Sequence, residues 1–435
     1  MLRSLYWVGS ALGAQRLPPG ALRALQLQRL RRMIAHCQQN VPFYGALWAE
    51  AGVGAADLRT LEDLARFPIP DRRALEEEPE RLVARPHLGL YRAGAGHIRR
   101  SGGSSGGPQL EVHADAASWA RLDGFYFRAL RAVGYDPRVS MAYFWGAPLP
   151  RRGLARAGLM MKVGVPAHLD EESQLLILEQ NPGIWWYYHP TSLFPLAKRF
   201  GKRLRATSPR GVISHAELLP RSMRAAIEAA LGVPVYDQYG TSEFNRMAWE
   251  CPARRGYHID ADSVILEVLG DDDRPVAPGE TGRAVVTGLI NQMMPLIRYE
   301  LGDLVVASDR RCECGRTLPM IEGIEGRAAD VVTLPGGGRR TPRELLEPYG
   351  GLDGLEQYRI AFEGRAEARF EYASSRPEAA PLERAIRAAF EASCPGVALS
   401  LRRVDALEKA PTGKRRMVSL ADGVAGGASA PRFVE

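Results

Sequence analysis

Residues 233–243, Val-Pro-Val-Tyr-Asp-Gln-Tyr-Gly-Thr-Ser-Glu, join a short apolar run to a polar turn. The apolar run at 233–237 predicts a buried strand, and ligands of α/β sheets collect in the crevice beyond the ends of such strands. An aromatic ring in this position can stack on a base, the hydroxyls of Thr241 and Ser242 can donate to a phosphate, and Glu243 can hold Mg²⁺. An ordinary polar turn can have the same composition, so this stretch alone does not distinguish a ligand site from a turn.

Helix-like and strand-like segments alternate around this stretch, which predicts an α/β core. The helical segments are 115–132 and 217–231, and the strand-like runs are 139–144, 183–188 and 211–214. Three further runs predict antiparallel strands, with turn signals Gly-Asp-Asp and Pro-Gly between the first two: 263–269, 283–289 and 304–307. We expect these strands to form a small β-barrel-like part of the same domain.

The chain of 435 residues exceeds the ~250–300 residues at which one hydrophobic core stops growing, so two domains are expected. Beyond residue 330, strand-like runs near 357–362, 367–372 and 397–404 accompany a helical segment at 377–393. This pattern predicts a smaller α+β domain. We therefore divide the chain into a large domain, 1–327, and a smaller one, 328–435.

The composition is that of a globular protein, with 46% hydrophobic and 25% charged residues, which excludes a mainly disordered or fibrous chain. The net charge is +7, but residues 1–40 hold six arginines and no acid, and so account for +6. Because the remaining chain is almost neutral, we expect no nucleic-acid-binding face.

Several of these arginines belong to a helix expected at 20–37. Its apolar face consists of Leu22, Leu25, Leu30, Met33, Ile34 and Cys37. A surface helix packed on the domain accounts for the pattern, and contact of the arginines with an anionic membrane or a partner is the alternative.

Localisation is expected to be cytoplasmic. No run approaches the ~18–20 apolar residues of a transmembrane span, and the apolar run within residues 1–15 is too short and interrupted for a signal peptide to be expected. Five cysteines are too few for a disulfide framework.

A glycine- and serine-rich stretch covers residues 99–108, Arg-Arg-Ser-Gly-Gly-Ser-Ser-Gly-Gly-Pro. Glycines let backbone amides turn toward phosphate oxygens, and serine hydroxyls add donors. The stretch lacks the lysine of P-loop NTPases, and a flexible linker has a similar composition. An extended segment and a helix follow it directly, which favours a functional loop.

Three further motifs follow along the chain. Residues 295–303, PLIRYELGD, end in a carboxylate that can accept both hydroxyls of a ribose, or that simply follows a hairpin turn. Residues 326–330, GRAAD, lie at the expected domain boundary. Residues 409–414, KAPTGK, form a turn that presents one of only five lysines.

In their order and separations, these five motifs resemble those of the adenylate-forming (ANL) ligases. The positions of the SSGTTGKP-type signature are taken by Ser101, Gly103, Ser104, Ser105, Gly106 and Pro108. Within that superfamily, residues 27–53 and 61–72 resemble the N-terminal opening of the phenylacetate–coenzyme A ligase group, which includes relatives associated with capsular polysaccharides. The resemblance extends from about residue 25 to 420.

The resemblance implies an α/β fold with a large N-terminal adenylate-forming domain and a smaller, mobile α+β C-terminal domain hinged at 326–330. It also implies a Mg²⁺- and ATP-dependent enzyme, an AMP-forming acid–thiol ligase. Such an enzyme activates a carboxylic acid as an acyl-adenylate and then passes the acyl group to coenzyme A.

The resemblance implies site residues as well. Lys414, Thr241 and Glu243 would be catalytic, with Lys414 bridging the carboxylate and the α-phosphate, and Glu243 binding Mg²⁺. The nucleotide would be bound by Ser101, Gly103, Ser104, Ser105, Gly106, Ser214, His215, Ala216, Glu217, Asp237, Tyr239, Gly240, Thr241, Ser242, Asp303 and Arg327. Within this set the glycine loop would hold the β- and γ-phosphates, residues 214–217 would line the adenine, and Asp303 would bind the ribose with help from Arg327.

Three positions depart from the family pattern: Gly107 stands in place of the usual lysine, Leu301 supplies no hydroxyl, and Ala329 replaces an acidic hinge residue. Two other functions therefore stay open. One is transfer of the acyl group to an amine, which forms an amide, and the other is a non-catalytic, zinc-stapled nucleotide-binding protein.

Cys251, His258, Cys312 and Cys314 form an independent set of four soft ligands suited to tetrahedral Zn²⁺. Their spacing is not the common CxxC pair, so ordinary core thiols are the alternative. Some members of the group carry zinc at a similar site, and the resemblance therefore favours a structural Zn²⁺. Cys37 and Cys394 are expected to be buried helix thiols.

Aromatic segments at 144–146 and 185–190 follow predicted strands. Most of these rings should belong to the core, and Trp145 and Tyr188 are the candidates to line a pocket for an apolar or aryl acid. The expected partners are a small carboxylic acid and either coenzyme A or an amine, and we allow for a homodimer. The acid itself is not identified by the sequence.

Overall fold

The structure is a computed structural model that describes residues 2–100, 110–145, 153–410 and 413–421. It divides into two compact units, each built from two stretches of chain. Unit 1 comprises Met1–Gly134 and Gln238–Gly323, and unit 2 comprises Tyr135–Asp237 and Ile324–Glu435. These units are compact groups of contacts, and the division into domains at 327/328 stays a prediction.

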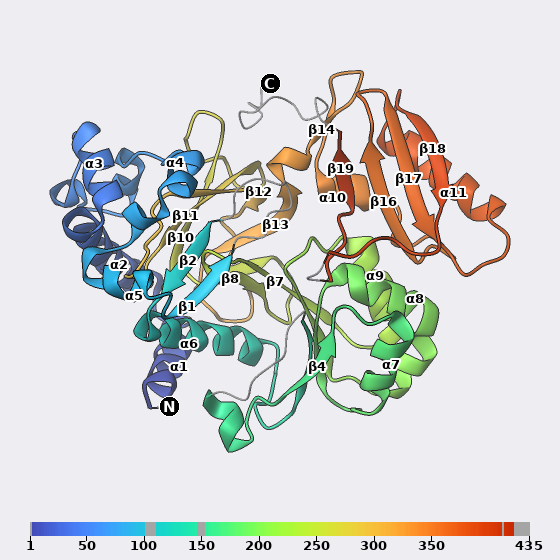
Figure 1. The fold of residues 1–435 in the computed structure, drawn as a ribbon, viewed down its shortest axis with the longest axis horizontal. Helices are drawn as coiled ribbons and strands as arrows, with labels where there is room; N and C mark the ends of the chain where they lie inside the picture. The colour runs from blue at the N-terminus through green and yellow to red at the C-terminus, as the bar shows by residue number, and fades with distance from the viewer. Residues whose placement is uncertain (1, 101–109, 146–152, 411–412, 422–435) are drawn as a thin grey trace. The chain divides into compact units, whose positions relative to one another are not determined.

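Unit 1 begins with helices (Figure 1), namely α1 (Leu2–Ala14), α2 (Pro19–Asn40), α3 (Pro42–Glu50), α4 (Arg72–Glu77), α5 (Leu88–Arg92) and α6 (Ala116–Ala132). Helix α2 confirms the helix expected at 20–37. Pro19 occupies its first turn, where the missing N–H costs nothing. Its apolar face buries the expected residues Leu22, Leu30, Met33, Ile34 and Cys37.

The main strands of unit 1 are β8 (Asn245–Glu250), β9 (Tyr257–Ile259), β10 (Val264–Leu269), β11 (Thr281–Gly288) and β12 (Tyr299–Ala307), and β13 (Met320–Arg327) begins in unit 1 and continues the chain into unit 2. They follow the order β10-β11-β12-β13-β9-β8. Within the described residues β10 pairs along one side only, with β11, so the sheet has a free edge and no closed barrel forms. The expectation of a barrel-like part is therefore wrong, although the α/β class is confirmed.

A separate antiparallel hairpin pairs β1 (His97–Arg100) with β2 (Glu111–Ala114). Residues 101–109, which connect these two strands along the chain, contain the predicted phosphate loop and lie outside the described residues. Strand β2 confirms the extended segment expected directly after the glycine-rich stretch, whereas its pairing with β1 was not predicted. Each strand has only four residues, and so short a sequence pattern does not distinguish a paired strand from an extended linker.

The first part of unit 2 is a parallel sheet with the order β6-β5-β3-β4. Its strands are β3 (Met141–Trp145), β4 (Lys162–Pro166), β5 (Trp185–Tyr188) and β6 (Gly211–His215), and its helices are α7 (Glu171–Glu179), α8 (Pro190–Ala206) and α9 (Arg221–Leu231). Strand β7 (Val235–Thr241) continues the chain into unit 1. Because β3, β5 and β6 run parallel, their carboxyl ends share one edge.

The second part of unit 2 contains α10 (Pro342–Leu346), α11 (Ala380–Ser393), a small hairpin of β14 (Val332–Thr333) and β15 (Arg339–Arg340), and a four-stranded sheet. The sheet has the order β18-β17-β16-β19, with β16 (Gln357–Phe362), β17 (Glu367–Ala373), β18 (Ala398–Arg403) and β19 (Val418–Leu420). These elements confirm the predicted α+β pattern.

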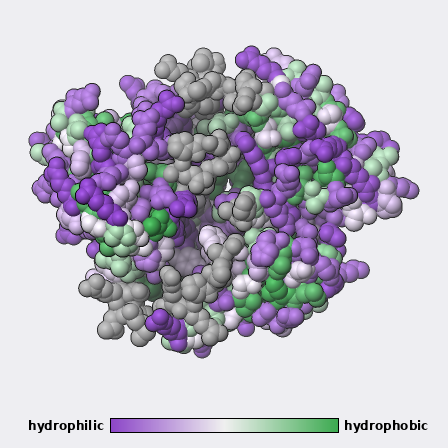
Figure 2. All heavy atoms as spheres, in the orientation of Figure 1, coloured by the Kyte–Doolittle hydropathy of each residue, from purple (hydrophilic) through white to green (hydrophobic). Residues whose placement is uncertain are grey.

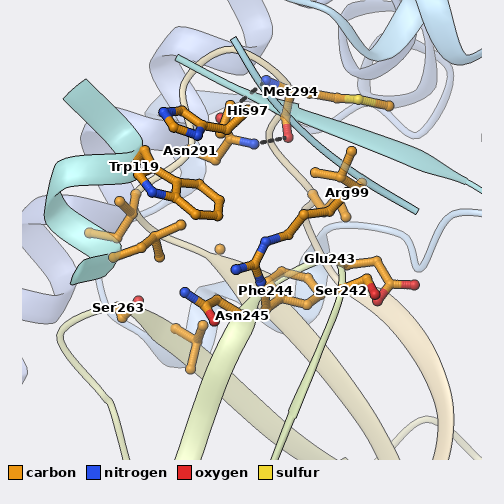
Figure 3. A pocket seen from close by; sticks show the side chains of 17 residues that line it. His97, Arg99, Trp119, Ser242, Glu243, Phe244, Asn245, Ser263, Asn291 and Met294 are labelled. Atoms are coloured by element: carbon orange, nitrogen blue, oxygen red, sulfur yellow. Dashed lines mark hydrogen bonds between the residues drawn. The ribbon is translucent and has the colours of Figure 1, made fainter. Parts of the chain in front are cut away.

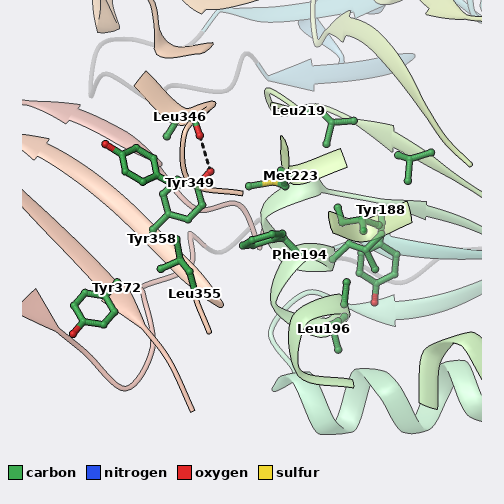
Figure 4. Close-up of a cluster of buried hydrophobic side chains, with 14 of the residues drawn as sticks. Tyr188, Phe194, Leu196, Leu219, Met223, Leu346, Tyr349, Leu355, Tyr358 and Tyr372 are labelled. Carbon is green, nitrogen blue, oxygen red and sulfur yellow. Dashed lines mark hydrogen bonds between the residues drawn. The ribbon is translucent and has the colours of Figure 1, made fainter. Parts of the chain in front are cut away.

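One apolar cluster joins the two parts of unit 2 (Figure 4). Phe194 on α8 meets Tyr358 on β16 edge to face, with ring centroids 6.2 Å apart. Tyr358 in turn donates its hydroxyl to Leu346 O at 3.1 Å, so the buried phenol is satisfied. The C-terminal segment is thus packed on α8 and α9 rather than merely tethered to them.

Large apolar side chains that remain exposed are scattered over five elements: Tyr6, Leu90, Ile98, Trp145 and Leu176. The face in Figure 2 accordingly shows mainly hydrophilic residues with small hydrophobic groups between them. None of the helices that the structure describes combines the length and the apolar character needed to cross a membrane.

A buried ion cluster ties the helices of unit 1 to its strands. Arg128 on α6 is fully buried and donates to Asp260 Oδ1 at 2.5 Å and to Asp262 Oδ1 at 2.7 Å. Its other terminal nitrogen donates to Ala11 O on α1 at 3.0 Å, and Trp249 Nε1 donates to Asp260 at 2.8 Å. Both carboxylates are also fully buried, so they need nearby cations to stay charged. Arg128 is closest to both, and Arg246 and Arg29 lie 3.9 Å from Asp260 and Asp262, respectively.

We expect Arg128→Met to destabilise the protein by about 3–5 kcal/mol, because it removes the nearest cation from two neighbouring buried carboxylates and leaves Arg246 and Arg29, each 3.9 Å away. The measurement is chemical unfolding followed by circular dichroism. The control is Arg138→Met, which removes an ion pair with Asp136 from an arginine side chain that is 80% exposed, and it should change the stability far less. Equal stabilities of the two variants would contradict this role of Arg128.

Candidate active site

The turn between β7 and β8 carries the Thr-Ser-Glu motif and is tightened by a bulge. The pairing register shifts between Tyr239 and Gly240. A Cβ atom on Gly240 would lie 2.3 Å from Asn245 O, so only glycine fits there. Thr241 Oγ1 accepts a hydrogen bond from Phe244 N at 3.3 Å. Local geometry therefore fixes the orientation of the motif.

Tyr239 and Asp303 come from different strands and meet in unit 1. The Tyr239 hydroxyl donates to Asp303 Oδ2 at 2.8 Å, and both residues are buried. Gly302 has a φ of 74° within β12, so the carboxylate stands in a distorted strand rather than after a hairpin turn. The structure thus brings together the residues that were predicted to cover the base and to bind the ribose.

A small cavity, partly open to solvent, lies beside Ser242 and Glu243 (Figure 3). On its opposite wall His97 stacks on Trp119 at 4.3 Å, and the Arg99 guanidinium lies 4.6 Å from the centroid of the same indole. The cavity therefore presents aromatic, cationic and anionic groups next to the predicted magnesium ligand.

In unit 2 the segment after β6 carries the Ser-His-Ala-Glu motif. Ser214 Oγ donates to Asp237 Oδ1 at 2.7 Å. Ala216 has a φ of 64°, a left-handed conformation that is uncommon for a residue with a Cβ. Glu217 accepts hydrogen bonds from Thr191 N at 3.0 Å and Thr191 Oγ1 at 2.7 Å, both through Oε2. The distorted turn thus directs this carboxylate to the start of α8.

The loop that carries Lys414 lies against the same edge of unit 2. Gly413 has a φ of 85°, and a Cβ atom there would lie 2.6 Å from the Cβ of Ala167 and 2.8 Å from the Phe144 ring. Ser192 Oγ donates to Gly413 O at 3.2 Å. The glycine therefore permits a close approach that places the following lysine near the ends of β3 and β5.

Lys414 is largely buried in an environment of mixed charge. Burial lowers the pKa of its amine, the Glu217 carboxylate opposes this shift, and the charge of Arg327 adds to it. Burial also raises the pKa of Glu217, while hydrogen bonds from Thr191 act against that rise. Lys414 and Glu217 are therefore electrostatic partners, and Arg327 lies within reach of the same charge.

The predicted site residues fall into three groups. Tyr239, Gly240, Thr241, Ser242, Glu243 and Asp303 lie in unit 1, whereas Ser214, His215, Ala216, Glu217, Asp237, Arg327 and Lys414 lie in unit 2. Ser101, Gly103, Ser104, Ser105 and Gly106 lie outside the described residues. The roles assigned to all of them stay predictions.

The two candidates for an acid pocket differ in position. Trp145 is 45% exposed at the end of β3, whereas Tyr188 is fully buried in the apolar cluster of unit 2. Sequence reasoning did not single out His189 and Thr191, which directly follow β5. The position of the aromatic segment 185–190 after a predicted strand was the available signal for His189, whereas His215 was selected from the family resemblance.

Cys251, His258, Cys312 and Cys314 do form a cluster, and their ligand atoms all lie within 4.8 Å of one another. Cys251 Sγ is 3.5 Å from Cys312 Sγ, and Cys314 Sγ is 3.3 Å from His258 Nε2. Four ligands at ~2.0–2.3 Å from a tetrahedral ion would be separated by about 3.3–3.8 Å. The cluster therefore fits a closed four-coordinate metal site. Cys37 and Cys394 are buried, as expected.

Comparison with known proteins gives close relatives by sequence, although no protein-family model matches the chain. A phenylacetate–coenzyme A ligase of Thermus thermophilus is 32% identical over 337 residues, which cover 74% of this chain and 73% of the relative. The enzyme of the same name from Escherichia coli is 30% identical over 331 residues, which cover 72% and 73%.

Solved structures share the fold at lower identity. A 2-hydroxyisobutyryl-CoA ligase in its postadenylation state superposes with a TM-score of 0.80 at 21% identity, covering 94% of this chain and 92% of that one. An anthranilate CoA ligase gives a TM-score of 0.55 at 15% identity, covering 73% and 65%. Both the resemblance to adenylate-forming ligases and the α/β fold inferred from it are confirmed.

We expect Glu217→Gln to lower the pKa of Lys414 further, because the variant removes the carboxylate that favours the charged amine while burial still disfavours it. The measurement is a pH titration of the lysine side-chain resonances by NMR, which is practical because the chain has only five lysines.

Lys198 is the internal control for this titration. Burial also lowers the pKa of its amine, but the neighbouring charges are Asp353, Arg376 and Glu356 rather than Glu217. Its titration should therefore be the same in the wild type and in Glu217→Gln. An unchanged or raised pKa of Lys414 in the variant would contradict the pairing.

Proposed function

Because the chain belongs to the phenylacetate–coenzyme A ligase family, we propose that it joins a carboxylic acid to coenzyme A through an acyl-adenylate, using ATP. The observation that supports this function best is Lys414, held largely buried beside Glu217 at the carboxyl edge of the parallel strands of unit 2. A buried lysine at a strand edge is costly for stability alone, and it suits a reaction that brings anions together.

We propose that Tyr239 and Asp303 bind the nucleoside. The buried Asp303 carboxylate accepts the Tyr239 hydroxyl at Oδ2, and a carboxylate has about four acceptor positions, so it can also accept from ribose hydroxyls. Thr241 and Ser242 would contact phosphate, and Glu243 would hold Mg²⁺, which supplies charge neutralisation at the phosphates when bound. Residues 101–106 would enclose the β- and γ-phosphates.

In the first half-reaction a carboxylate oxygen of the acid attacks the α-phosphorus of ATP. The new P–O bond gives the acyl-adenylate, and the bond to pyrophosphate breaks. Both partners are anionic, so the barrier depends on positioning and on neutralisation of charge, which we assign to Lys414. In the second half-reaction the thiol of coenzyme A attacks the acyl carbonyl, AMP leaves, and the thiol proton is released.

We propose that residues 328–435 change position between the two half-reactions, with 326–330 as the hinge. Once the acyl-adenylate has formed, the carboxylate charge is gone and only the α-phosphate charge is left, so Lys414 is less needed there and its withdrawal would open room for the acceptor. Gly326 supports a hinge because its φ of 109° favours glycine and a Cβ atom there would lie 2.7 Å from Pro342. The cytoplasmic location and a homodimer likewise stay predictions.

The test of this function is ATP–pyrophosphate exchange across a panel of carboxylic acids, followed by mass spectrometry of products formed with coenzyme A or with amines. Acid-dependent exchange and a coenzyme A thioester would support the proposal. An amide as the sole product would favour the amine-transferring alternative. Absence of exchange with every acid would favour a non-catalytic nucleotide-binding protein.

We expect Lys414→Ala to lose adenylation by about 10²–10³-fold, the scale for removal of one preorganised transition-state group. The same variant should convert a synthetic acyl-adenylate to the thioester at a rate close to that of the wild type. The two half-reactions are measured separately by pyrophosphate exchange and by thioester formation.

Lys409→Ala is the matched control, because Lys409 lies in the same loop and donates to Leu169 O at 3.1 Å, away from Glu217. It should retain most of the adenylation activity. An equal loss of both half-reactions in Lys414→Ala would mean that Lys414 has only a structural role.

We also propose that the Cys/His cluster holds a structural Zn²⁺, since four ligands leave no open position for substrate. Purified protein should contain about one zinc per chain by elemental analysis, and Cys312→Ser should lose both the metal and thermal stability. Cys37→Ser, which removes a buried thiol outside the cluster, should keep the metal. Protein without zinc whose five thiols all react while folded would refute the site.

A further inference from the structure

Five aromatic rings form a continuous row, here called the stack although only the first three are parallel, at the carboxyl edge of β3, β5 and β6 in unit 2. Tyr143 stacks on Tyr187 at 4.8 Å, and Tyr187 stacks on His215 at 3.9 Å. His215 lies 4.7 Å from His189, which contacts Phe144 at 5.2 Å. The register explains the stack, because Tyr143 pairs with Tyr187 across β3 and β5, and Tyr187 pairs with the residue two before His215 on β6.

The two histidines of this stack are buried, and three of their four ring nitrogens have no hydrogen-bond partner among the described residues. His189 is 1% and His215 is 7% exposed. The unpaired atoms, among the described residues, are both ring nitrogens of His189 and Nε2 of His215. A buried polar atom left unpaired costs about 1–3 kcal/mol, and natural proteins keep few of them. Both imidazoles therefore offer hydrogen bonds that a ligand could complete.

Both imidazoles are uncharged at neutral pH. Burial lowers the pKa of His189 to about 3, and the Lys414 charge lowers it further. Burial lowers the pKa of His215 well below its usual value, with additional effects of His189, Lys414 and Lys162. A neutral imidazole has one N–H donor and one acceptor nitrogen, which matches a hydroxyl group better than a second carboxylate.

The stack lies beside the lysine that we assign to the acid's carboxylate. Gly413 would touch Phe144 if it had a Cβ atom, and the Lys414 charge acts on both histidines. An acid whose carboxylate meets Lys414 would therefore have its neighbouring atoms close to His189 and His215.

We propose that His189 and His215 are specificity-determining residues that hydrogen-bond a hydroxyl group of the substrate, so that this ligase selects hydroxy acids over the corresponding unsubstituted acids. The inference rests on the proposed function, since it assigns the substrate class of that adenylation site. The rings of Tyr143 and Tyr187 continue beside His215, and their apolar edges suit an aromatic or compact apolar remainder of the acid.

The test compares three matched pairs of acids in ATP–pyrophosphate exchange: mandelate with phenylacetate, 4-hydroxyphenylacetate with phenylacetate, and salicylate with benzoate. In at least one pair, kcat/KM should be about 10–100-fold higher for the hydroxy acid, because the unsubstituted acid leaves buried nitrogens unpaired. The three pairs differ in the position of the hydroxyl group, so the pair that shows the preference identifies the position that the histidines bind.

His215→Phe keeps a ring in the stack but removes its nitrogens, and His189→Phe does the same at the neighbouring position. His189→Phe should reduce the preference to within about 3-fold of unity while exchange with the unsubstituted acid is retained. His215 is also predicted to line the adenine, so for His215→Phe only the ratio of kcat/KM between the two acids of a pair is compared, and this ratio should fall to the same range. His168→Phe, at an exposed histidine of unit 2, is the control and should keep the wild-type preference.

The outcomes separate this inference from the function on which it rests. If the wild type exchanges equally well with unsubstituted acids and with hydroxy acids, the inference is overturned and the proposed function stays intact. This comparison needs no variant. A preference that survives both histidine variants would overturn it as well. Absence of exchange with every acid would instead refute the proposed function, and the inference with it.

Discussion

The parallel arrangement of β3, β5 and β6 is the constraint on which the candidate active site depends. Because these strands run in the same direction, the side chains that follow each of them gather at one edge, as in other open α/β sheets. His189, His215 and Glu217 stand at this edge although they are separated along the chain by helices and loops. The loop carrying Lys414 reaches the same edge because Gly413 allows the backbone to approach Phe144.

The electrostatics of this edge suit a reaction between anions. Burial alone would favour a neutral Lys414, whereas the Glu217 carboxylate favours the charged amine. Glu217 is itself held in place by the backbone and the hydroxyl of Thr191. When a substrate carboxylate and a phosphate enter, they would add negative charge next to an amine that is already positioned. Little reorganisation would then be needed, which is the property that makes fixed charges effective in catalysis.

The packing of unit 2 sets a condition on the proposed motion of residues 328–435. Glu347 accepts the backbone N–H groups of Arg221 and Ser222 at 2.9 and 2.7 Å, and so caps α9 from the C-terminal segment. Water can replace such hydrogen bonds at small net cost. Exposure of Phe194 and Tyr358 to water would cost more, because rings of this size bury a large apolar area. A movement that preserves part of the apolar cluster is therefore easier than complete separation.

Sequence alone determined the local features of this protein. The alternation of helices and strands, the five motifs in order and the four soft metal ligands predicted an α/β adenylate-forming ligase, and β16 begins and ends where the apolar pattern did. These features depend on neighbours along the chain, which a sequence displays. The open edge at β10, the hydrogen bond between Tyr239 and Asp303, and the packing of His189 against His215 depend on which strands pair and which side chains become buried. Only the tertiary structure decided these features, because contacts between distant segments depend on which apolar faces become buried against each other in the folded chain.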